Sequence, residues 1–297
     1  MILQTEHLSK SYGGRTLFHD VTFRLEEYDR LALVGPNGAG KTTLLSALTA
    51  QMPVDAGTVT YGGAPVWENE AVLGELCFSR ELGSTVGGMN NALKVKDYLN
   101  AGRLFYPHWD EAYAQKLITQ FKLAPKKMIS ALSKGMASML TIVLALASRA
   151  PITFMDEPVA GLDVVAREDF YRLLLDDYAE TGRTFVISTH ILEEASNVFE
   201  KVLIMKEGRL IEACDADELL AQFCAVTGRD DVVNEACAGL NILHTETLGR
   251  QKSCVVRVPA ETMAAKGLDV DCTSLPLQKV FVALCGHEQE LQEHREG

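Results

Sequence analysis

The sequence predicts an α/β fold whose core is a mostly parallel sheet, and three observations lead to this prediction. Short apolar runs at residues 30–34, 151–155 and 184–188 have the length and composition of buried strands. Longer segments with helical spacing of apolar residues separate these runs, and strands that alternate with helices are typical of a parallel sheet. A glycine-rich loop at residues 35–43 joins the first of these runs to a helical segment.

The first strands of the chain are expected to pair in the antiparallel direction. Residues 2–7 and 16–25 alternate apolar and polar side chains and are separated by a turn at residues 11–14. A second turn at residues 26–29 leads into the first apolar run, and residues 56–63 hold another strand between glycine turns. We therefore predict an N-terminal antiparallel β-subdomain that leads into the core.

A helical segment interrupts the core. Tyr113, Leu117 and Phe121 recur at every fourth position, which is the spacing of one face of a helix. The surrounding residues lack the pattern of strands. We therefore predict a helical subdomain inserted over about residues 83–131.

The core is expected to resume after this insertion with a buried helix at residues 138–149. A helix at residues 164–180, closed by Gly182, then connects the second and third apolar runs. Residues 201–213 alternate around Glu207-Gly208 as a hairpin does.

The pattern weakens from residue 214 onward. We expect a helix near residues 217–223, a strand at 254–258 and an apolar helix at 277–284. A chain of 297 residues with 47% hydrophobic content is long enough to bury one sizeable core and one smaller core. The sequence therefore predicts two domains, residues 1–213 and a small C-terminal α+β domain at 214–297.

Composition excludes several classes of function. A net charge of −12 and an isoelectric point near 5.1 are the opposite of the positive charge with which proteins bind nucleic acids, so no nucleic-acid partner is expected. The seven cysteines are odd in number and contain no C-x-x-C pair, so we interpret them as small buried hydrophobes rather than disulfides or zinc ligands. The apolar stretch at residues 139–147 is shorter than the roughly 20 residues that span a bilayer. The first residues lack the pattern of a secretion signal, so a cytoplasmic location is expected.

The glycine-rich loop carries the strongest chemical signal. It has the form G-x-x-x-x-G-K-T, with a predicted strand before it and a predicted helix after it. Glycines let backbone N–H groups curl around a polyphosphate at a helix N-terminus, whose dipole favours negative charge. Lys41 would reach the β- and γ-phosphates, and the Thr42 hydroxyl would ligate Mg²⁺. The alternative is a glycine turn that binds nothing, but the intact motif and its context favour a P-loop NTPase core.

Two further predicted strands are followed by residues that could take part in catalysis. Asp156 and Glu157 follow the second apolar run, at the end of a strand where α/β sheets present ligands. Asp156 would hold Mg²⁺, and Glu157 would polarise the water that attacks the γ-phosphate. His190 follows the third run, where its imidazole could orient that water. The alternatives are an acidic turn that caps a strand and a satisfied structural histidine.

Together these motifs resemble those of a known family. Leu132-Ser133-Lys134-Gly135-Met136 precedes Asp156-Glu157, whereas Ala160-Gly161-Leu162-Asp163 and His190 follow it. This order is similar to that of ABC-type ATPases, so residues 1–213 resemble an ABC transporter nucleotide-binding subunit. The segment at 274–286 is similar to the accessory domain of bacterial exporter-type (ABC-2 type) subunits.

The resemblance implies a head-to-tail dimer, of identical or different ATPase chains, with two ATP molecules between the subunits. Tyr12 would stack on adenine, although a partly exposed strand-end tyrosine is the alternative. Ser133 and the Gly135 backbone would close on the γ-phosphate held by the other subunit, and Asp163 would couple the two sites. The residues assigned to ATP are thus Tyr12, Gly35, Pro36, Asn37, Gly38, Ala39, Gly40, Lys41, Thr42, Thr43, Ser133, Gly135 and Asp163. Thr42 and Asp156 are assigned to Mg²⁺, and Glu157 and His190 to catalysis.

Two positions depart from the family pattern. The signature segment, residues 132–136, has Leu-Ser-Lys-Gly-Met where the family usually has Leu-Ser-Gly-Gly-Gln. The usual Q-loop glutamine is replaced within residues 77–81, and we align Arg80 with it. A guanidinium offers Mg²⁺ no lone pair, so we expect Arg80 to face the membrane subunit instead. The departures indicate either slow, partner-dependent hydrolysis or drift within a working enzyme.

The sequence therefore predicts a Mg-ATPase subunit that powers a separate integral membrane permease from the cytoplasmic face of the membrane. One alternative is a soluble ABC-type ATPase that acts on ribosomes or DNA. Such proteins usually carry a second nucleotide domain or coiled-coil arms, which this sequence lacks. The other alternative is an ATP-dependent regulatory switch with little turnover. The transported substrate and its direction stay open.

Overall fold

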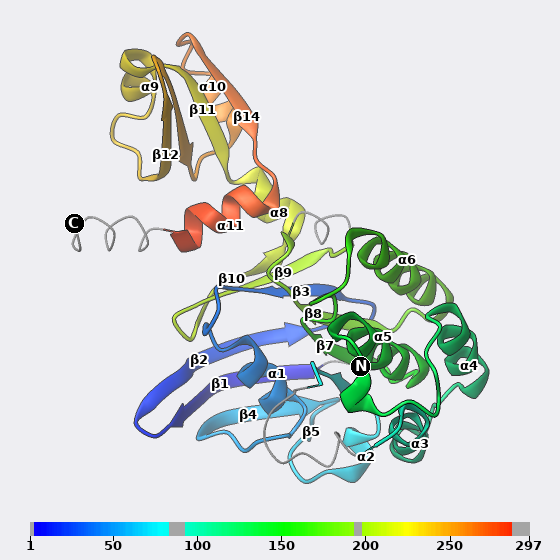
Figure 1. Ribbon diagram of the computed structural model, residues 1–297. Helices are drawn as coiled ribbons and strands as arrows, with labels where there is room; N and C mark the ends of the chain where they lie inside the picture. Colours follow the sequence, from blue (N-terminus) through cyan, green and yellow to red (C-terminus); the bar gives the residue numbers. More distant parts are fainter. Residues whose placement is uncertain (1–2, 83–92, 193–197, 287–297) are drawn as a thin grey trace. The chain divides into compact units, whose positions relative to one another are not determined.

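The computed structural model describes residues 3–82, 93–192 and 198–286. The chain divides into two compact units (Figure 1). The first comprises residues 1–190 and 205–213, and the second comprises residues 191–204 and 214–297. The sequence predicts one domain boundary, after residue 213, and this boundary stays a prediction. Among the described helices, none is both long and apolar enough to cross a bilayer.

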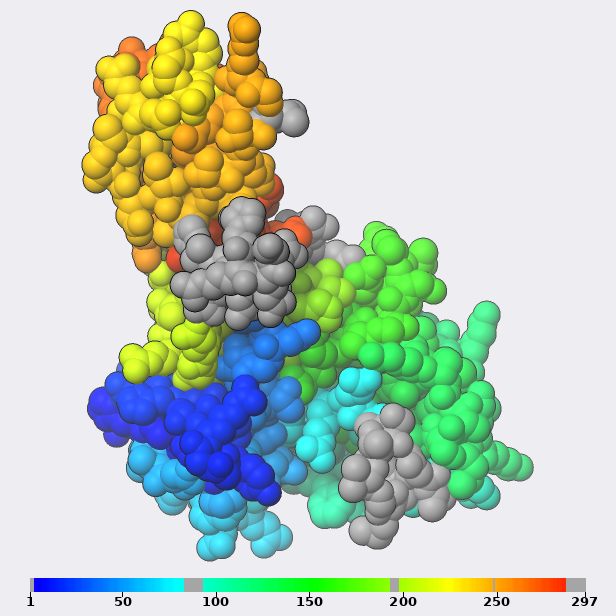
Figure 2. Space-filling view, turned by 60° about the vertical axis from the view of Figure 1, so that its left-hand side comes forward, coloured from blue at the N-terminus to red at the C-terminus, as the bar shows by residue number. Residues whose placement is uncertain are grey.

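The N-terminal strands form an antiparallel sheet, as predicted. Its order is β2-β1-β4-β5, and its strands are β1 (Leu3–Tyr12), β2 (Arg15–Leu25), β4 (Ala56–Tyr61) and β5 (Ala64–Pro65). Gly13 and Gly14 form the β1–β2 turn with φ angles of 57° and 82°, which glycine adopts without steric cost. The dark blue surface of β1 and β2 adjoins the lighter blue surface of β4 in Figure 2. Burial of Leu3, Leu8 and Phe18 fixes the inner face of this sheet.

The core is a six-stranded sheet in the order β10-β9-β3-β8-β7-β6. Its strands are β3 (Arg30–Val34), β6 (Leu76–Ser79), β7 (Ile152–Asp156), β8 (Thr184–Ser188), β9 (Lys201–Lys206) and β10 (Arg209–Asp215). The pairs β3–β8, β8–β7 and β7–β6 are parallel. The predicted mostly parallel sheet and the hairpin around Glu207-Gly208 are confirmed. Because neighbouring strands run in one direction, their carboxyl ends meet at one edge.

The described helices of the unit that holds the core sheet include α1 (Lys41–Leu48), α5 (Lys134–Ala147) and α6 (Val164–Thr181). Helix α5 begins four residues before the predicted helix, because the Ser133 hydroxyl accepts a hydrogen bond from the Met136 N–H and caps it. From Leu140 to Ala147 every side chain of α5 is buried. Helix α6 ends at Gly182, whose left-handed φ of 62° closes the last turn as predicted.

The predicted helical subdomain is present in the described part of residues 83–131. It contains α3 (Val95–Phe105), α4 (Glu111–Gln120) and a 3₁₀ turn at Ile129–Ala131, and a short helix α2 (Glu70–Leu73) precedes it. Helices α3 and α4 both pack against α5 (Figure 1). Residues 83–92 of the predicted insertion lie outside the described residues.

The C-terminal unit is a small α+β domain, as predicted, but it is more regular than its sequence indicates. After residue 213, its first described helix is α8 (Ala216–Ala221) and its last described helix is α11 (Leu277–Cys285). Between them lie β11 (Cys224–Arg229), α9 (Asp230–Ala236), β12 (Ile242–Leu248), β13 (Gln251–Val256), α10 (Ala260–Ala264) and β14 (Val270–Ser274). The strands form an antiparallel sheet in the order β12-β13-β11-β14.

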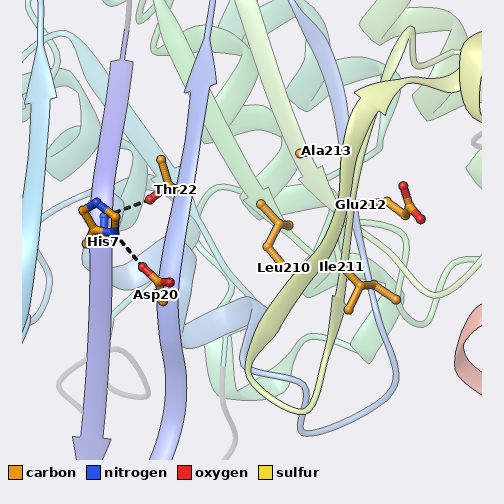
Figure 3. A pocket seen from close by; sticks show the side chains of 7 residues that line it. All are labelled: His7, Asp20, Thr22, Leu210, Ile211, Glu212 and Ala213. Carbon is orange, nitrogen blue, oxygen red and sulfur yellow. Dashed lines mark hydrogen bonds and ion pairs between the residues drawn. The ribbon is translucent and has the colours of Figure 1, made fainter.

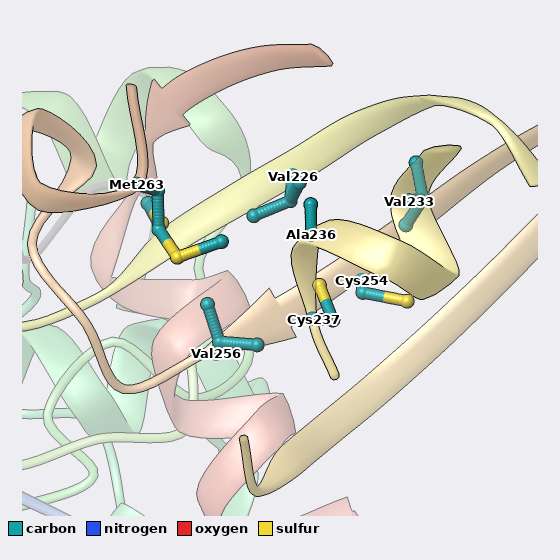
Figure 4. Packing of buried hydrophobic residues seen from close by; sticks show 8 residues of the cluster. Val226, Val233, Ala236, Cys237, Cys254, Val256 and Met263 are labelled. Carbon is teal, nitrogen blue, oxygen red and sulfur yellow. The ribbon is translucent and has the colours of Figure 1, made fainter. Parts of the chain in front are cut away.

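Small side chains fill the core of this domain. Val226 and Val256 project from the sheet toward Val233 of α9 and Met263 of α10 (Figure 4). Three buried thiols, those of Cys224, Cys237 and Cys254, belong to the same cluster. Burial raises the pKa of Cys224 to about 11, which leaves its thiol protonated and unreactive.

The interpretation of the cysteines is correct in part. None of the seven forms a disulfide, and Cys77 is buried like the three thiols of the C-terminal core. Cys214, Cys272 and Cys285 are half-buried, so the prediction of burial was wrong for these three. They lie on or next to strands and helices whose other face is exposed.

Candidate functional site

The ends of adjacent strands bring the predicted catalytic segments together. Strand β8 lies between β3 and β7, with Leu33 and Asp156 both opposite Ser188. The phosphate-binding loop therefore leaves the sheet beside Asp156-Glu157 and His190, although these residues lie far apart in the chain. Strand β6 ends beside β7, since Ser79 pairs with Met155. The segment that follows β6 thus starts at the same edge.

The phosphate-binding loop needs glycine at two positions for steric reasons. A Cβ atom at Gly35 would come within 2.5 Å of the Met205 carbonyl oxygen. Gly40 has a φ of 104°, and a Cβ atom there would meet the Leu17 carbonyl oxygen at 2.6 Å. Gly40 also precedes α1 directly, so the loop ends at a helix N-terminus, where backbone N–H groups and the helix dipole favour an anion.

The Lys41 side chain folds back across this loop. Its Nζ atom donates hydrogen bonds to the Gly35 carbonyl at 2.7 Å and the Pro36 carbonyl at 3.3 Å. Burial lowers the pKa of the Lys41 ammonium, while the negative charges of Glu157 and Asp156 oppose this shift. The ammonium is thus held inside the loop, at the place where a polyphosphate would need a cation.

A pair of oxygen ligands fits a magnesium ion. The Thr42 hydroxyl donates a 2.7 Å hydrogen bond to Asp156 Oδ2, so the two predicted Mg²⁺ ligands are adjacent. The Ser188 hydroxyl donates to the other carboxylate oxygen of Asp156. Mg²⁺ prefers oxygen ligands and is commonly held by one or two protein groups together with substrate phosphates and water. Ser188 was not predicted, although its place at the end of a strand, two residues before His190, could have indicated it.

Glu157 and His190 form a pair beside this site. The His190 Nδ1 atom lies 2.7 Å from Glu157 Oε2. Glu157 has a left-handed φ of 48°, which is strained for a residue other than glycine. The Glu157 N–H is held by the Ser188 hydroxyl at 3.0 Å. The Glu157 carboxylate thus lies beside the His190 imidazole, and a carboxylate has the chemistry to accept a proton from water.

The signature segment meets the 160–163 loop. A Cβ atom at Gly135 would lie 2.9 Å from the Gly161 carbonyl oxygen, so only glycine permits this approach. The Ser138 hydroxyl donates to the Ala160 carbonyl at 2.6 Å, and Asp163 caps α6 by accepting from the Ala166 N–H. The Ala160 N–H in turn donates to the Glu157 carbonyl at 3.0 Å. The signature segment is therefore connected to the catalytic pair through one short loop.

Tyr12 and Arg80 occupy exposed positions. Tyr12 is 79% exposed at the end of β1, on the hairpin whose Leu17 contacts the phosphate-binding loop. Arg80 follows β6 with its side chain exposed, whereas the Ser79 hydroxyl before it donates to the Thr141 carbonyl of α5. Glu81, which no motif singled out, forms an ion pair of 3.2 Å with Lys134.

A hollow in the surface lies apart from these motifs. It has a volume of about 460 Å³ and is lined by residues of β1, β2 and β10 (Figure 3). Within it, His7 Nδ1 lies 2.6 Å from Asp20 Oδ1, and the His7 N–H donates to the Thr22 hydroxyl. Both ring and carboxylate are largely exposed. The hydrogen bond and charge of Asp20 raise the pKa of His7.

Comparison with known proteins agrees with this geometry. The family model described as ABC transporter matches residues 18–160. The hemin import ATP-binding protein HmuV of Thermobifida fusca is 33% identical over 71% of this chain and 75% of its own length. The chain belongs to the family of ABC transporter ATP-binding proteins.

A second relative of this family matches almost the whole chain. The Nod factor export ATP-binding protein I of Paraburkholderia xenovorans is 29% identical over 97% of this chain and 98% of its own length. A solved structure of the ATP-binding subunit of an ABC transporter matches with a TM-score of 0.64 and 25% identity, over 74% of this chain and 92% of that one. The chain therefore has the fold of an ABC cassette.

Proposed function

We propose that this ABC ATP-binding protein binds Mg-ATP at residues 35–43 and hydrolyses it to drive a separate integral membrane permease. The observation that carries the proposal is the cluster at one sheet edge. Lys41 lies inside the loop, Thr42 contacts Asp156, and Glu157 contacts His190. Each of these groups has a distinct task in phosphoryl transfer.

The chemistry follows from the positions of these groups. Lys41 would exchange its two loop carbonyls for the phosphate oxygens of ATP, which form stronger, charge-assisted hydrogen bonds. Thr42 and Asp156 would hold Mg²⁺, which neutralises charge on the phosphates. The Glu157 carboxylate would accept the proton of the attacking water, and His190 would fix the orientation of that carboxylate.

A complete site would need a second copy or a related ATPase chain. Ser133 and Gly135 would approach the γ-phosphate bound to the other subunit, Asp163 would couple the two sites, and Tyr12 would stack on adenine. This arrangement rests on the family resemblance, and both a homodimer and a heterodimer fit it. The exposure of Tyr12 supports a role in binding a flat ring.

The partner is proposed to be a permease of an exporter-like system, with this chain at the cytoplasmic face of the membrane. The support is the extent of the matches. The relative named for Nod factor export matches 97% of the chain, whereas the relative named for hemin import matches 71%. The C-terminal domain thus belongs to the part shared with the export protein.

The test uses Glu157→Gln, which keeps the size of the side chain but removes the base. We expect Mg-ATP affinity within about threefold of the parent chain and a fall in phosphate release of about 10²-fold or more. Glu235→Gln, the same change at an exposed position of α9, serves as the control and should release phosphate normally.

Two results would contradict the proposal. Equal phosphate release by both variants would remove Glu157 from the catalytic role. A parent chain that binds ATP but releases no phosphate, even with its permease, would favour the regulatory switch.

A further inference from the structure

Lys134, in the signature segment, contacts two other segments near the catalytic edge. Its ammonium pairs with Glu81 of the segment after β6 at 3.2 Å. Its stem lies on the 160–163 loop, since a Cβ atom at Gly161 would meet Lys134 Cγ at 2.6 Å. The same loop is hydrogen-bonded to Glu157 through Ala160. The Lys134 side chain therefore touches both the 160–163 loop and the segment after β6 that contains Glu81.

The position of Lys134 is unfavourable for the helix that it begins. Lys134 is the first residue of α5, and the first turn of α5 contains no acidic residue. A positive charge at a helix N-terminus is opposed by the helix dipole, which favours an anion there. Helix stability therefore gives no reason for a lysine at this position. An anion close to the ammonium does give such a reason, and in this structure that anion is Glu81.

The ion pair is easily exchanged. The side chains of Lys134 and Glu81 are 60% and 51% exposed. Ion pairs at such exposed positions contribute little to stability, so a more highly charged anion can displace the carboxylate. A polyphosphate is such an anion, and its oxygens form stronger hydrogen bonds with an ammonium group.

We propose that Lys134 is a latch with two partners: it holds Glu81 within its own chain, or it binds the polyphosphate of an ATP carried by a second ATPase subunit. The proposal rests on the proposed function, in which Ser133 and Gly135 approach that ATP. Lys134 lies between these two residues in the chain, so the proposal places its flexible, exposed ammonium within reach of the same ATP. Release of Glu81 then frees residues 80–82, which directly follow β6, whenever the dimer closes.

The test measures ATP-driven dimer formation in the Glu157→Gln background, where bound ATP persists. Light scattering during size-exclusion chromatography gives the ATP concentration at half-maximal dimer. Binding of a fluorescent ATP analogue to the dilute monomer gives the affinity of the loop itself. Lys134→Met removes the charge but keeps the stem on Gly161, and Lys126→Met is the matched control at an exposed position.

The latch predicts opposite effects for its two members. Lys134→Met should raise the half-maximal ATP concentration about tenfold, because a charge-assisted contact is lost. Glu81→Gln should lower it about threefold, because Lys134 is no longer held in its own chain. Monomer affinity should stay within about twofold for Lys134→Met and Lys126→Met.

A charge swap separates this role from a structural one. The double variant Lys134→Glu with Glu81→Lys keeps an ion pair between the segments but presents a carboxylate to the polyphosphate. The latch predicts that ATP-driven dimers fail to form in this variant. A structural bridge predicts that they form as in the parent, and that result would overturn the proposal.

Other results of the same experiment would overturn the latch, head-to-tail closure or the proposed function. An unchanged dimer with Lys134→Met, or a weaker dimer with Glu81→Gln, overturns the latch and leaves the proposed function intact. A background chain that binds ATP but forms no dimer, either with itself or with a related ATPase chain, overturns both the latch and head-to-tail closure. A background chain that fails to bind ATP overturns the proposed function itself.

Discussion

Replacing Asp177 with asparagine should destabilise the ATPase unit strongly, although Asp177 lies in no motif. The side chain is fully buried and accepts from two arginines, Arg149 at 2.9 Å and Arg183 at 2.8 Å. Arg149 also reaches Asp110, which caps α4, and Arg183 donates to the Leu146 carbonyl of α5. Through these two arginines, the Asp177 carboxylate of α6 connects α4, α5 and the start of β8.

The expected loss follows from the chemistry of this cluster. Asparagine keeps the volume of Asp177 but removes its charge, and its NH₂ group would face a guanidinium donor. Loss of one partner of a buried ion pair typically costs about 3–5 kcal/mol. For a unit of this size about 1 kcal/mol shifts the melting temperature by about 2–4 °C. The melting temperature of the ATPase unit should therefore fall by about 6–20 °C.

Differential scanning calorimetry of the full chain measures this shift. Asp176→Asn is the matched control, since Asp176 precedes Asp177 on α6 and is exposed. That change should cost less than about 0.5 kcal/mol. Equal melting temperatures for the two variants would show that the buried cluster does not hold the helices together.

Three further predictions concern individual charges. Lys41→Ala should weaken ATP binding about tenfold or more, because the loop loses its side-chain cation; calorimetric titration showing less than threefold weakening would refute this. Arg80→Ala should leave the phosphate release of the isolated chain nearly unchanged and reduce its stimulation by the permease. A tenfold loss in the isolated chain, about 1.4 kcal/mol of barrier, would instead make Arg80 catalytic. Asp20→Asn should lower the pKa of His7 toward 6.5, measured by NMR titration. Since the pKa of His7 is raised in the folded chain, the pair stabilises the fold fully below about pH 6.5. This stabilisation disappears as the pH rises through the pKa that His7 has in the folded chain. An unchanged His7 titration in Asp20→Asn would exclude the pairing.

Local sequence patterns predicted the core because each element there is marked independently. The apolar run before Gly35 identifies β3, and the loop motif identifies the start of α1. Strands β7 and β8 are short, continuous apolar runs, as expected for strands buried on both faces. The convergence of Lys41, Asp156 and His190 then follows from the parallel direction of the strands.

The features that sequence reasoning missed depend on tertiary contacts. The left-handed backbone of Glu157 is maintained by a hydrogen bond from its N–H to Ser188, thirty-one residues further along the chain. The pairing of Lys134 with Glu81 likewise joins residues that no local pattern links. In the C-terminal domain, β12 and β14 carry polar residues on their exposed face, so their strand pattern is weak.

The two ends of α5 are held in different ways, and this difference bears on how the site can move. At its C-terminal end, Arg149 and the buried Asp177 fix α5 to α4 and α6 with groups that are costly to separate. At its N-terminal end, the ion pair of Lys134 with Glu81 is exposed and costs little to break. In the proposed latch, the exposed ion pair can therefore open while the buried cluster at the other end of α5 persists. Asp177 then keeps the C-terminal end of α5 in place when, as proposed, Lys134 exchanges Glu81 for the polyphosphate of a second subunit.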